Sequence, residues 1–308
     1  MAEKRAGGWT EHTVTGAQAG QTVQEIVTGT MGVSRRQIQK LTRSRGIVLN
    51  RRPTYLAKPV QRGDVVAVRL GGEAAPRLAP VAMELNVVYE DAHLLVLDKP
   101  PYLLVHPTQP DQQHTLVHGV AHYYCVRGVR AGVHPVHRLD RDTSGLVVIA
   151  KDARTHQRLD EQLRARALRR RYLALVDGVL REDAGVVDAP IARHPTQPVL
   201  RAVRPDGEPA RTRWRVIERF AAATLVELEL ETGRTHQIRV HLAHLGHPLL
   251  GDRQYGRRGL KLIQRQALHA WRLAFRHPAS GEPVELEAAL PPDMTQLRET
   301  LRGDTPGG

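Results

Sequence analysis

The fold and the chemistry of this chain are decided by Val136–Gly145, whose sequence is VHRLDRDTSG. At its centre stands Asp140, between a His-Arg-Leu segment and an Asp-Thr-Ser-Gly segment. Gly132 and Pro135 precede it and are typical of a loop. The apolar, β-branched run Leu146–Ala150 follows it and is typical of a buried strand. We therefore expect a carboxylate held in a loop at the start of a rigid strand, a common position for a reacting group.

The segment HRLDRDTSG resembles the signature of the pseudouridine synthases that act on large-subunit ribosomal RNA, and of their tRNA-acting relatives. In that family the aspartate after His-Arg-Leu is catalytic, so the resemblance assigns this role to Asp140. The residues alone leave open a plain turn, in which Asp140, Asp142 and Thr143 satisfy loop amides. By resemblance, Arg138 fills the space that a flipped base vacates, and His137 and Thr143 are expected at the substrate.

Other segments resemble further motifs of the same family, in the same order. DKP followed by VHP resembles the first motif, which lines the active-site cleft. YLALVDG resembles the second, so the catalytic tyrosine maps to Tyr172. TGRTHQIRVH resembles the third: the arginine that pairs with the catalytic carboxylate maps to Arg239, and the apolar residue that supports the pocket maps to Ile238. The resemblance covers nearly the whole chain.

The composition agrees with an RNA partner. The chain has 308 residues, a formal net charge of +13 and a pI near 10.5, which indicate a polyanionic partner such as structured RNA. Only six of its 45 basic residues are lysines, so no arginine is taken as a ligand from its identity alone. The one cysteine, Cys125, excludes an internal disulfide and is expected to be a small core residue. No apolar run is long enough for a membrane span, and Met1–Gly20 lacks the apolar stretch of a signal peptide, so we expect a cytoplasmic protein.

The pattern predicts a modular chain. We expect a flexible leader over residues 1–20, an RNA-binding module over 21–70 and a Gly, Ala and Pro linker over 71–80. The catalytic domain is expected over 81–302, followed by a flexible tail over 303–308.

The expected N-terminal module resembles the RNA-binding domain named after ribosomal small-subunit protein four. Ser34 and Gln37 form a capping-box pattern at the start of a basic helix, and strands are predicted at Ile47–Leu49 and Val65–Val68. Such a helix on a small sheet contacts phosphates without reading sequence. A solvated helix face and a helix-turn-helix DNA reader are the alternatives. The residues expected to contact RNA are Arg35, Arg36, Lys40 and Arg43.

In the catalytic domain, hydrophobic patterning predicts several further elements. These are strands at Val87–Tyr89, Leu94–Leu97 and Thr224–Leu230, and an amphipathic helix at Ala153–Arg166. The Pro- and Arg-rich segment 186–218 is expected to be rich in hairpins, and no chemistry is assigned to it.

The resemblance implies an α+β fold, in which a bent, mixed and largely antiparallel sheet is flanked by helices and follows a small α/β module. It implies an RNA pseudouridine synthase that acts on structured RNA, with large-subunit ribosomal RNA expected first and a monomer as the working unit. The reaction changes no oxidation state and loses no group, so no cofactor is expected. The clustered histidines suggest a metal site, but the mechanism needs none, and we expect no metal. The alternatives are a tRNA-acting synthase, a catalytically silent RNA-binding or ribosome-assembly protein of the same fold, and a hydrolase using Asp140 as nucleophile.

Overall fold

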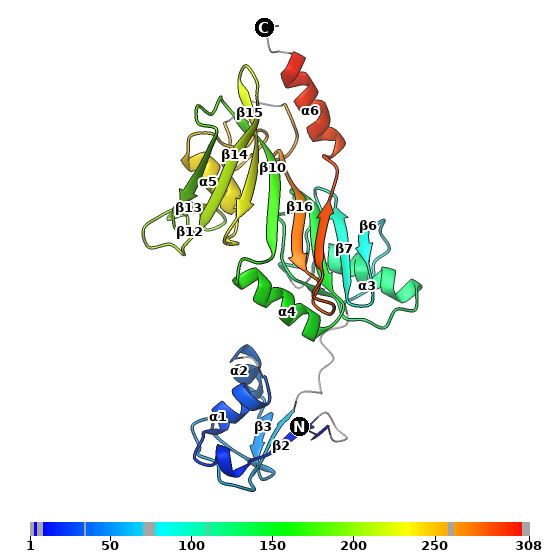
Figure 1. Ribbon diagram of the computed structural model, residues 1–308, viewed down its shortest axis with the longest axis vertical. Helices are drawn as coiled ribbons and strands as arrows, with labels where there is room; N and C mark the ends of the chain where they lie inside the picture. The colour runs from blue at the N-terminus through cyan, green and yellow to red at the C-terminus, as the bar shows by residue number, and fades with distance from the viewer. Residues whose placement is uncertain are drawn as a thin grey trace. The chain divides into compact units, whose positions relative to one another are not determined.

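The computed structural model (Figure 1) describes residues 3–4, 9–33, 35–69, 78–109, 111–257 and 262–303, without the side chains of residues 3, 4, 35, 36 and 40. The chain divides into two compact units, Met1–Arg77 and Leu78–Gly308. No helix in the described ranges is long and apolar enough to cross a membrane.

The first unit is a small sheet packed against short helices. Its strand order is β1-β2-β5-β3-β4. The strands are β1 (Glu3–Lys4), β2 (Trp9–Thr13), β3 (Ile47–Leu49), β4 (Arg52–Pro53) and β5 (Val65–Arg69). The helices are the 3-10 turn η1 (Gly16–Gln18), α1 (Val23–Glu25), the π-helical turn η2 (Ile26–Thr30) and α2 (Arg35–Arg43). The strands predicted at 47–49 and 65–68 are therefore present, whereas the capping residue Ser34 lies outside the described residues.

A capping box fixes the start of α1. The Thr22 hydroxyl accepts a hydrogen bond from the Glu25 amide at 3.3 Å, and the Glu25 carboxylate accepts one from the Thr22 amide at 2.7 Å. This reciprocal pair satisfies amides that the first helical turn leaves unpaired. It brings Val23 and Ile26 onto the buried side of the helix, where they pack with Val66 of β5.

The second unit is built on one mixed, largely antiparallel sheet. Its strand order is β11-β14-β15-β10-β16-β9-β7-β6, with β17 beside β16 and β8 beside β9. The strands are β6 (Asn86–Glu90), β7 (Leu94–Lys99), β8 (His134–Pro135), β9 (Ser144–Ala150), β10 (Arg169–Asp177), β11 (Ala184–Asp188), β14 (Arg211–Arg219), β15 (Ala223–Leu230), β16 (Leu268–Arg276) and β17 (Pro283–Glu287). A separate hairpin joins β12 (Ile191–Arg193) and β13 (Arg201–Val203). The helices are α3 (Leu116–Val126), α4 (Ala153–Arg164), α5 (Gln237–His244) and α6 (Pro292–Gly303).

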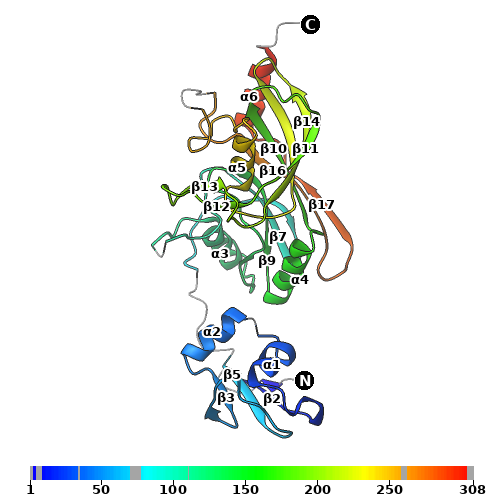
Figure 2. The ribbon, with the colours of Figure 1, turned by 90° about the vertical axis from the view of Figure 1, so that its left-hand side faces the viewer.

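Alternation along the strands gives this sheet two buried faces. Residues 147 and 149 of β9, with 172, 174 and 176 of β10, point to the face that packs against α3 and α5. Residues 146, 148 and 150 of β9 point to the opposite face, against α4, and Leu175 of β10 packs with α6. Figure 2 shows α3 and α5 on one side of the sheet and α4 on the other. Because the sheet is mixed and largely antiparallel and is flanked by a few helices, the expected α+β class is confirmed.

The junction between β9 and β16 depends on one glycine. These two strands are parallel, with Gly145 opposite Ala270. Gly145 has a φ of +113°, and a Cβ placed on it would lie 2.2 Å from the Ala270 carbonyl oxygen. Any other residue would therefore clash with the backbone and strain its own conformation. Gly145 lets the loop that precedes β9 lie directly against β16.

Several predictions in this unit are refined or corrected. The strands expected at 87–89, 94–97 and 224–230 are present, and the predicted helix 153–166 is α4, which ends at Arg164. The Pro- and Arg-rich segment forms β11, the β12–β13 hairpin and β14. The prediction for Cys125 was wrong: it is exposed near the end of α3, because the buried part of that helix is mainly its first half, residues 116–120.

Candidate active site

The loop that carries Asp140 is held by its neighbours in sequence. The Val136 amide donates to the Val148 carbonyl at 2.9 Å, and the Thr143 amide donates to the Asp140 carbonyl at 3.1 Å. Leu139 is buried in the core between the sheet and α3 and α5. The loop therefore has an apolar anchor directly before its turn, and the Asp140 side chain remains 18% exposed.

Two buried basic side chains donate hydrogen bonds to backbone carbonyl groups of the same loop. Lys99, at the end of β7, donates from Nζ to the carbonyls of Arg141 (3.1 Å) and Leu103 (2.8 Å). Arg265 donates to the carbonyl of Asp142 (3.2 Å) and forms a two-point ion pair with Asp293 of α6. Burial, together with the nearby Arg265 charge, lowers the pKa of Lys99 to about 7. These contacts fix the backbone of the two residues that follow Asp140.

Arg239 of α5 brings a cation to the Asp140 carboxylate. Its Nη1 donates to Asp140 Oδ2 at 3.2 Å. Its Nε and Nη2 donate to the two oxygens of Asp252 at 2.7 and 2.9 Å, and Nη2 also donates to Gln254 Oε1 at 2.7 Å. The guanidinium is thus held rigidly by Asp252, whose side chain is fully buried, with one edge turned toward Asp140.

The balance of charges keeps Arg239 protonated. Burial opposes its positive charge, but the hydrogen bonds and the negative charge of Asp252, together with Asp140, outweigh burial and raise the pKa of Arg239. The arrangement therefore places a fixed positive charge beside the Asp140 carboxylate, to which Arg239 donates a charge-assisted hydrogen bond.

His236 approaches Asp140 from the residue before α5. It adopts a left-handed conformation with φ +59°, and its Nε2 lies 3.9 Å from Asp140 Oδ2. Its Nδ1 lies 2.9 Å from the Tyr255 hydroxyl, which accepts a hydrogen bond from the Arg201 amide. Burial lowers the pKa of His236, although Asp140 acts in the opposite direction.

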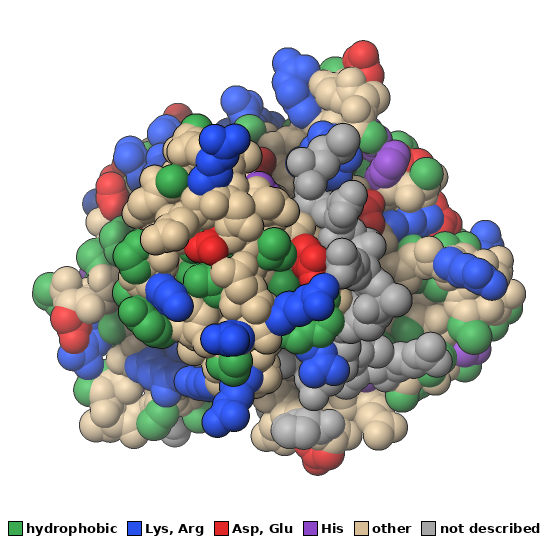
Figure 3. All heavy atoms as spheres, turned by 90° about the horizontal axis from the view of Figure 1, so that it is seen from below, with side chains coloured by type: hydrophobic (Ala, Val, Ile, Leu, Met, Phe, Trp, Pro, Cys, Tyr) green, Lys and Arg blue, Asp and Glu red, His purple; other side chains and the backbone are tan. Residues whose placement is uncertain are grey.

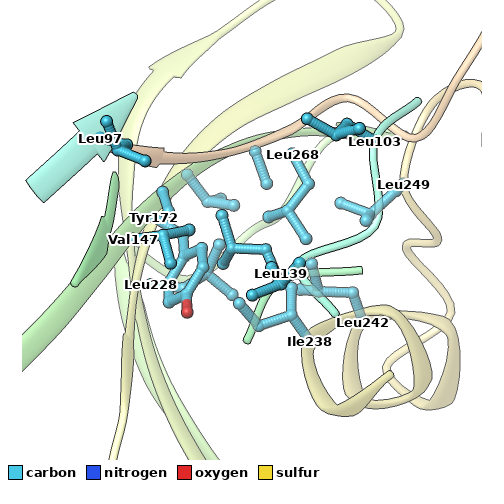
Figure 4. Packing of buried hydrophobic residues seen from close by; sticks show 14 of the residues in the cluster. Leu97, Leu103, Leu139, Val147, Tyr172, Leu228, Ile238, Leu242, Leu249 and Leu268 are labelled. Atoms are coloured by element: carbon cyan, nitrogen blue, oxygen red, sulfur yellow. The ribbon is translucent and has the colours of Figure 1, made fainter. Parts of the chain in front are cut away.

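Tyr172 lies on β10, in the strand pair opposite Leu228 of β15. Its ring is buried, 3% exposed, in the cluster that also holds Ile238 and Leu242 of α5. Figure 4 shows the ring within this cluster and its hydroxyl oxygen at the cluster edge. Burial raises the pKa of the Tyr172 hydroxyl, so the phenol stays protonated at neutral pH.

Two hollows meet at Asp140. One, of about 500 Å³, is lined by Arg239 and His236 and by the segments 104–108 and 251–266 where they are described. The other, of about 570 Å³, is lined by Tyr172 and by the segment 230–235. Arg138 and Asp140 line both, and the Arg138 side chain is exposed. The carboxylate therefore stands at the boundary between two openings, each large enough for a nucleotide base.

The remaining residues expected at the substrate are buried. Ile238 packs in the core beside Tyr172. His137 lines the hollow that contains Tyr172, and its Nε2 accepts from the Val148 amide at 3.3 Å. Burial, with the nearby Arg170 charge, lowers the pKa of His137 to about 3. Thr143 lies under the loop, 1% exposed, and its hydroxyl accepts from Gln266 Nε2 at 3.3 Å, outside the lining of either hollow.

Of the residues expected to contact RNA through the first unit, Arg43 is exposed on α2. The side chains of Arg35, Arg36 and Lys40 lie outside what the structure describes. The described ranges contain no group of three or more His, Cys, Asp or Glu residues that could hold a metal ion. Two of the clustered histidines have other partners, since His241 lies 2.9 Å from the Thr212 hydroxyl and His247 lies 2.8 Å from the Asp177 carbonyl.

Sequence reasoning missed Asp252, Tyr255 and Arg265. Asp252 and Tyr255 belong to the segment GDRQYG, which resembles an ordinary polar turn. Arg265 belongs to an arginine-rich background in which identity alone carries little information. No local pattern could have shown that Asp252 is the fully buried partner of Arg239.

Comparison with known proteins identifies relatives of this chain. Residues 93–244 match the family model described as RNA pseudouridylate synthase. The chain is 41% identical to the uncharacterised RNA pseudouridine synthase YhcT of Bacillus subtilis (strain 168), over 92% of this chain and 94% of the relative. It is 43% identical to the ribosomal large subunit pseudouridine synthase D of Escherichia coli O6:H1, over 79% of this chain and 78% of the relative.

A solved structure agrees with these relatives. Human RNA pseudouridylate synthase domain containing 4 is 28% identical to this chain, and the two structures superpose with a TM-score of 0.59. The likeness covers 70% of this chain and 93% of the human one.

Proposed function

The chain belongs to the RNA pseudouridylate synthase family and is an RNA pseudouridine synthase, and on this premise we propose that it modifies large-subunit ribosomal RNA with Asp140 as the reacting carboxylate. The name of the Escherichia coli relative, at 43% identity, supports this substrate. The single observation that carries the assignment of Asp140 is its 3.2 Å contact with Arg239, which Asp252 holds in place.

The reaction explains why a charged carboxylate is needed. Pseudouridine forms when the N1–C1′ bond of uridine breaks, the base turns and a C5–C1′ bond forms, while the proton on C5 moves to another acceptor. An ionised carboxylate can attack the sugar or the ring, or can assist loss of the base through a glycal. Arg239 and His236 both face Asp140 Oδ2, and the described residues offer no hydrogen bond to Oδ1. Oδ1 is therefore the oxygen we assign to the reaction.

The other site residues take supporting roles. A stacked uridine is out of reach of the carboxylate, so the target must leave the helix. The exposed Arg138 side chain, which lines both hollows, is placed to fill the space that the base leaves. Tyr172, with its protonated phenol at the edge of the core, can stack on the flipped base and relay a proton. Ile238 supports the Tyr172 ring from α5.

The first unit, Met1–Arg77, is assigned to RNA binding as a module that resembles the domain named after ribosomal small-subunit protein four. Its exposed basic side chains support this role. They are Arg43, Arg45, Arg51, Arg52, Lys58, Arg62 and Arg69. Basic side chains are spread over the face of the molecule that Figure 3 shows, with fewer acidic ones between them. Phosphate contacts of this kind add affinity without reading sequence. The protein would act as a monomer in the cytoplasm.

Carbodiimide-based mapping of pseudouridine tests the substrate assignment. Ribosomal and transfer RNA are compared between cells with and without the gene. Loss of one or more sites in large-subunit ribosomal RNA is the expected result. Loss confined to transfer RNA would move the substrate to that class, and unchanged RNA throughout would favour a catalytically silent binding protein.

A further inference from the structure

Arg170 is a buried cation without an anionic partner in the described chain. It lies on β10 and shares a face with Tyr172, and the residue is 7% exposed. Its one hydrogen bond to the described residues runs from Nη2 to the Thr232 carbonyl at 3.3 Å, and its Nε is buried without a partner. Because an uncompensated buried charge is costly, this guanidinium calls for an anion that the described residues do not supply.

The hollow that Arg170 lines adjoins Asp140. It also contains Tyr172, Arg138 and the segment 232–235. Both acidic residues that line it are already engaged. Asp140 contacts Arg239 at 3.2 Å, and Glu231 pairs with Arg166 at 2.7 Å and with Arg213 at 2.6 Å. The hollow therefore carries an excess of positive charge, which favours an anionic group such as a phosphate near Arg170.

Because Gly233 has no side chain, one edge of the Arg170 guanidinium is left uncovered. A Cβ on this residue would lie 3.3 Å from Arg170 Nη1, so any side chain would crowd that donor. Nη1 donates no hydrogen bond to the residues that the structure describes, and it remains available on this side. A planar guanidinium with a free edge matches the geometry of phosphate oxygens.

We propose that Arg170, which lines the hollow beside Gly233, is the buried cation of a phosphate subsite. The subsite takes a backbone phosphate of the RNA, next to the uridine on which Asp140 acts. The identity of the phosphate as one from RNA rests on the proposed function, whereas the subsite itself rests on the geometry. Arg170 binds and positions the substrate and takes no part in bond making.

A first experiment needs no RNA. Thermal unfolding of wild type, Arg170→Met and Arg170→Lys is followed with and without inorganic phosphate, with sodium chloride at matched ionic strength. Removing an uncompensated buried charge should leave Arg170→Met at least as stable as wild type without phosphate. Phosphate should raise the midpoint of wild type, raise that of Arg170→Lys in part, and leave Arg170→Met unmoved.

Arg171→Met is the matched control. Arg171 is the next residue on the same strand, faces the other side and pairs with Glu229 at 3.0 Å. This variant should keep the phosphate response. A Met variant at 170 that is less stable than wild type, or does not fold, would show that Arg170 has a structural role. A phosphate response that survives in Arg170→Met would likewise overturn the subsite.

A second experiment connects the subsite to RNA. Short RNAs that carry the uridine found by mapping are made with a neutral methylphosphonate at each position in turn. For the wild type, the methylphosphonate should weaken RNA binding most at one position next to the uridine. Arg170→Met should bind the RNA with the methylphosphonate at that position as tightly as it binds the unmodified RNA. The Met variant should raise KM, leave kcat within a few fold, and reduce the slope of log affinity against log salt by about 0.7.

The subsite would be refuted as a contact with RNA phosphate if the methylphosphonate and Arg170→Met each reduced RNA affinity independently of the other. A fall in kcat at unchanged KM in Arg170→Met would refute it as well. If wild type modifies no RNA, the proposed function fails, while the inorganic phosphate experiment still decides whether the subsite exists.

Discussion

Asp252 accepts hydrogen bonds from both Nε and Nη2 of Arg239, at 2.7 and 2.9 Å, so the arginine beside the candidate catalytic carboxylate cannot rotate freely. The Asp252 side chain is fully buried, and the residue lies 13 positions after Arg239 in the sequence. It fixes Arg239 at one edge so that the other edge can face Asp140. The orientation of Asp140 thus depends on a residue that has no place in the recognised motifs.

Replacing Asp252 with Asn tests this dependence. The change leaves the Arg239 charge buried without its main partner, and breaking a buried pair of this kind costs about 3–5 kcal/mol. We expect the free energy of unfolding in urea to fall by that order and turnover to fall with it. The control is Glu287→Gln, which breaks an exposed pair with Arg272 and should cost less than about 1 kcal/mol. An Asp252→Asn variant with unchanged stability and turnover would contradict the role given to Asp252.

Replacing Tyr172 with Phe tests the proton relay. The ring keeps its place in the core, while the hydroxyl at its edge is lost. If the phenol moves a proton, turnover should fall about 10²–10⁴-fold with RNA affinity almost unchanged. Tyr89→Phe is the control, because the Tyr89 hydroxyl donates to Asp91 at 2.7 Å, among residues that line neither hollow. Full turnover in Tyr172→Phe would contradict the proton relay and would leave the Tyr172 ring with stacking as its one role.

His269 makes the fold sensitive to acid. It is fully buried beneath the Asp140 loop, where its Nδ1 lies 2.9 Å from the Ser144 hydroxyl, and burial lowers its pKa to about 4. The unfolded chain, with a pKa near 6.5, binds a proton first as the pH falls, so stability decreases between about pH 6.5 and 4. We expect His269 to account for a loss of about 2 kcal/mol between pH 7 and 4.5.

Urea unfolding across this pH range, in wild type and in His269→Asn, measures that contribution. The Asn variant is less stable at neutral pH but should lose less stability on acidification, because it has no imidazole to protonate. Parallel pH profiles for the two proteins would show that His269 is not the group responsible.

Removing residues 1–77 tests the RNA-binding role of the first unit. The remaining unit contains the sheet and both hollows. We expect it to bind RNA more weakly and with a shallower dependence on salt, because phosphate contacts are lost. The salt slope is measured by filter binding on the same RNA, and an identical slope for both proteins would argue against the assigned role.

The recognised motifs singled out residues that the structure brings close together. Asp140 and Arg239 lie 99 positions apart in sequence and meet at 3.2 Å. Tyr172 lines the same hollow as Asp140. Strands with strong β-branched runs were also predicted, because burial on both faces leaves a continuous apolar pattern. The run Leu146–Ala150 is one example, and the structure extends this strand to Ser144–Ala150.

The helices α3 and α5 were missed for a physical reason. Residues 116–120 of α3 and residues 237–242 of α5 are buried in unbroken runs, so neither shows the one-sided pattern of a surface helix. Arg170 and Arg265 could not be singled out either. Their importance lies in burial and in missing or distant partners, which a chain rich in arginine conceals.

The central claim is that Asp140 carries the reaction, and Asp140→Asn tests it most directly. Asparagine keeps the shape of the side chain but removes the charge and the nucleophile. RNA binding should persist, because phosphate contacts supply most of the affinity. The measurement is the amount of pseudouridine in RNA from cells that lack the gene and are complemented with each variant. The account predicts no detectable pseudouridine at the target site with Asp140→Asn, and restoration to the wild-type level would contradict it.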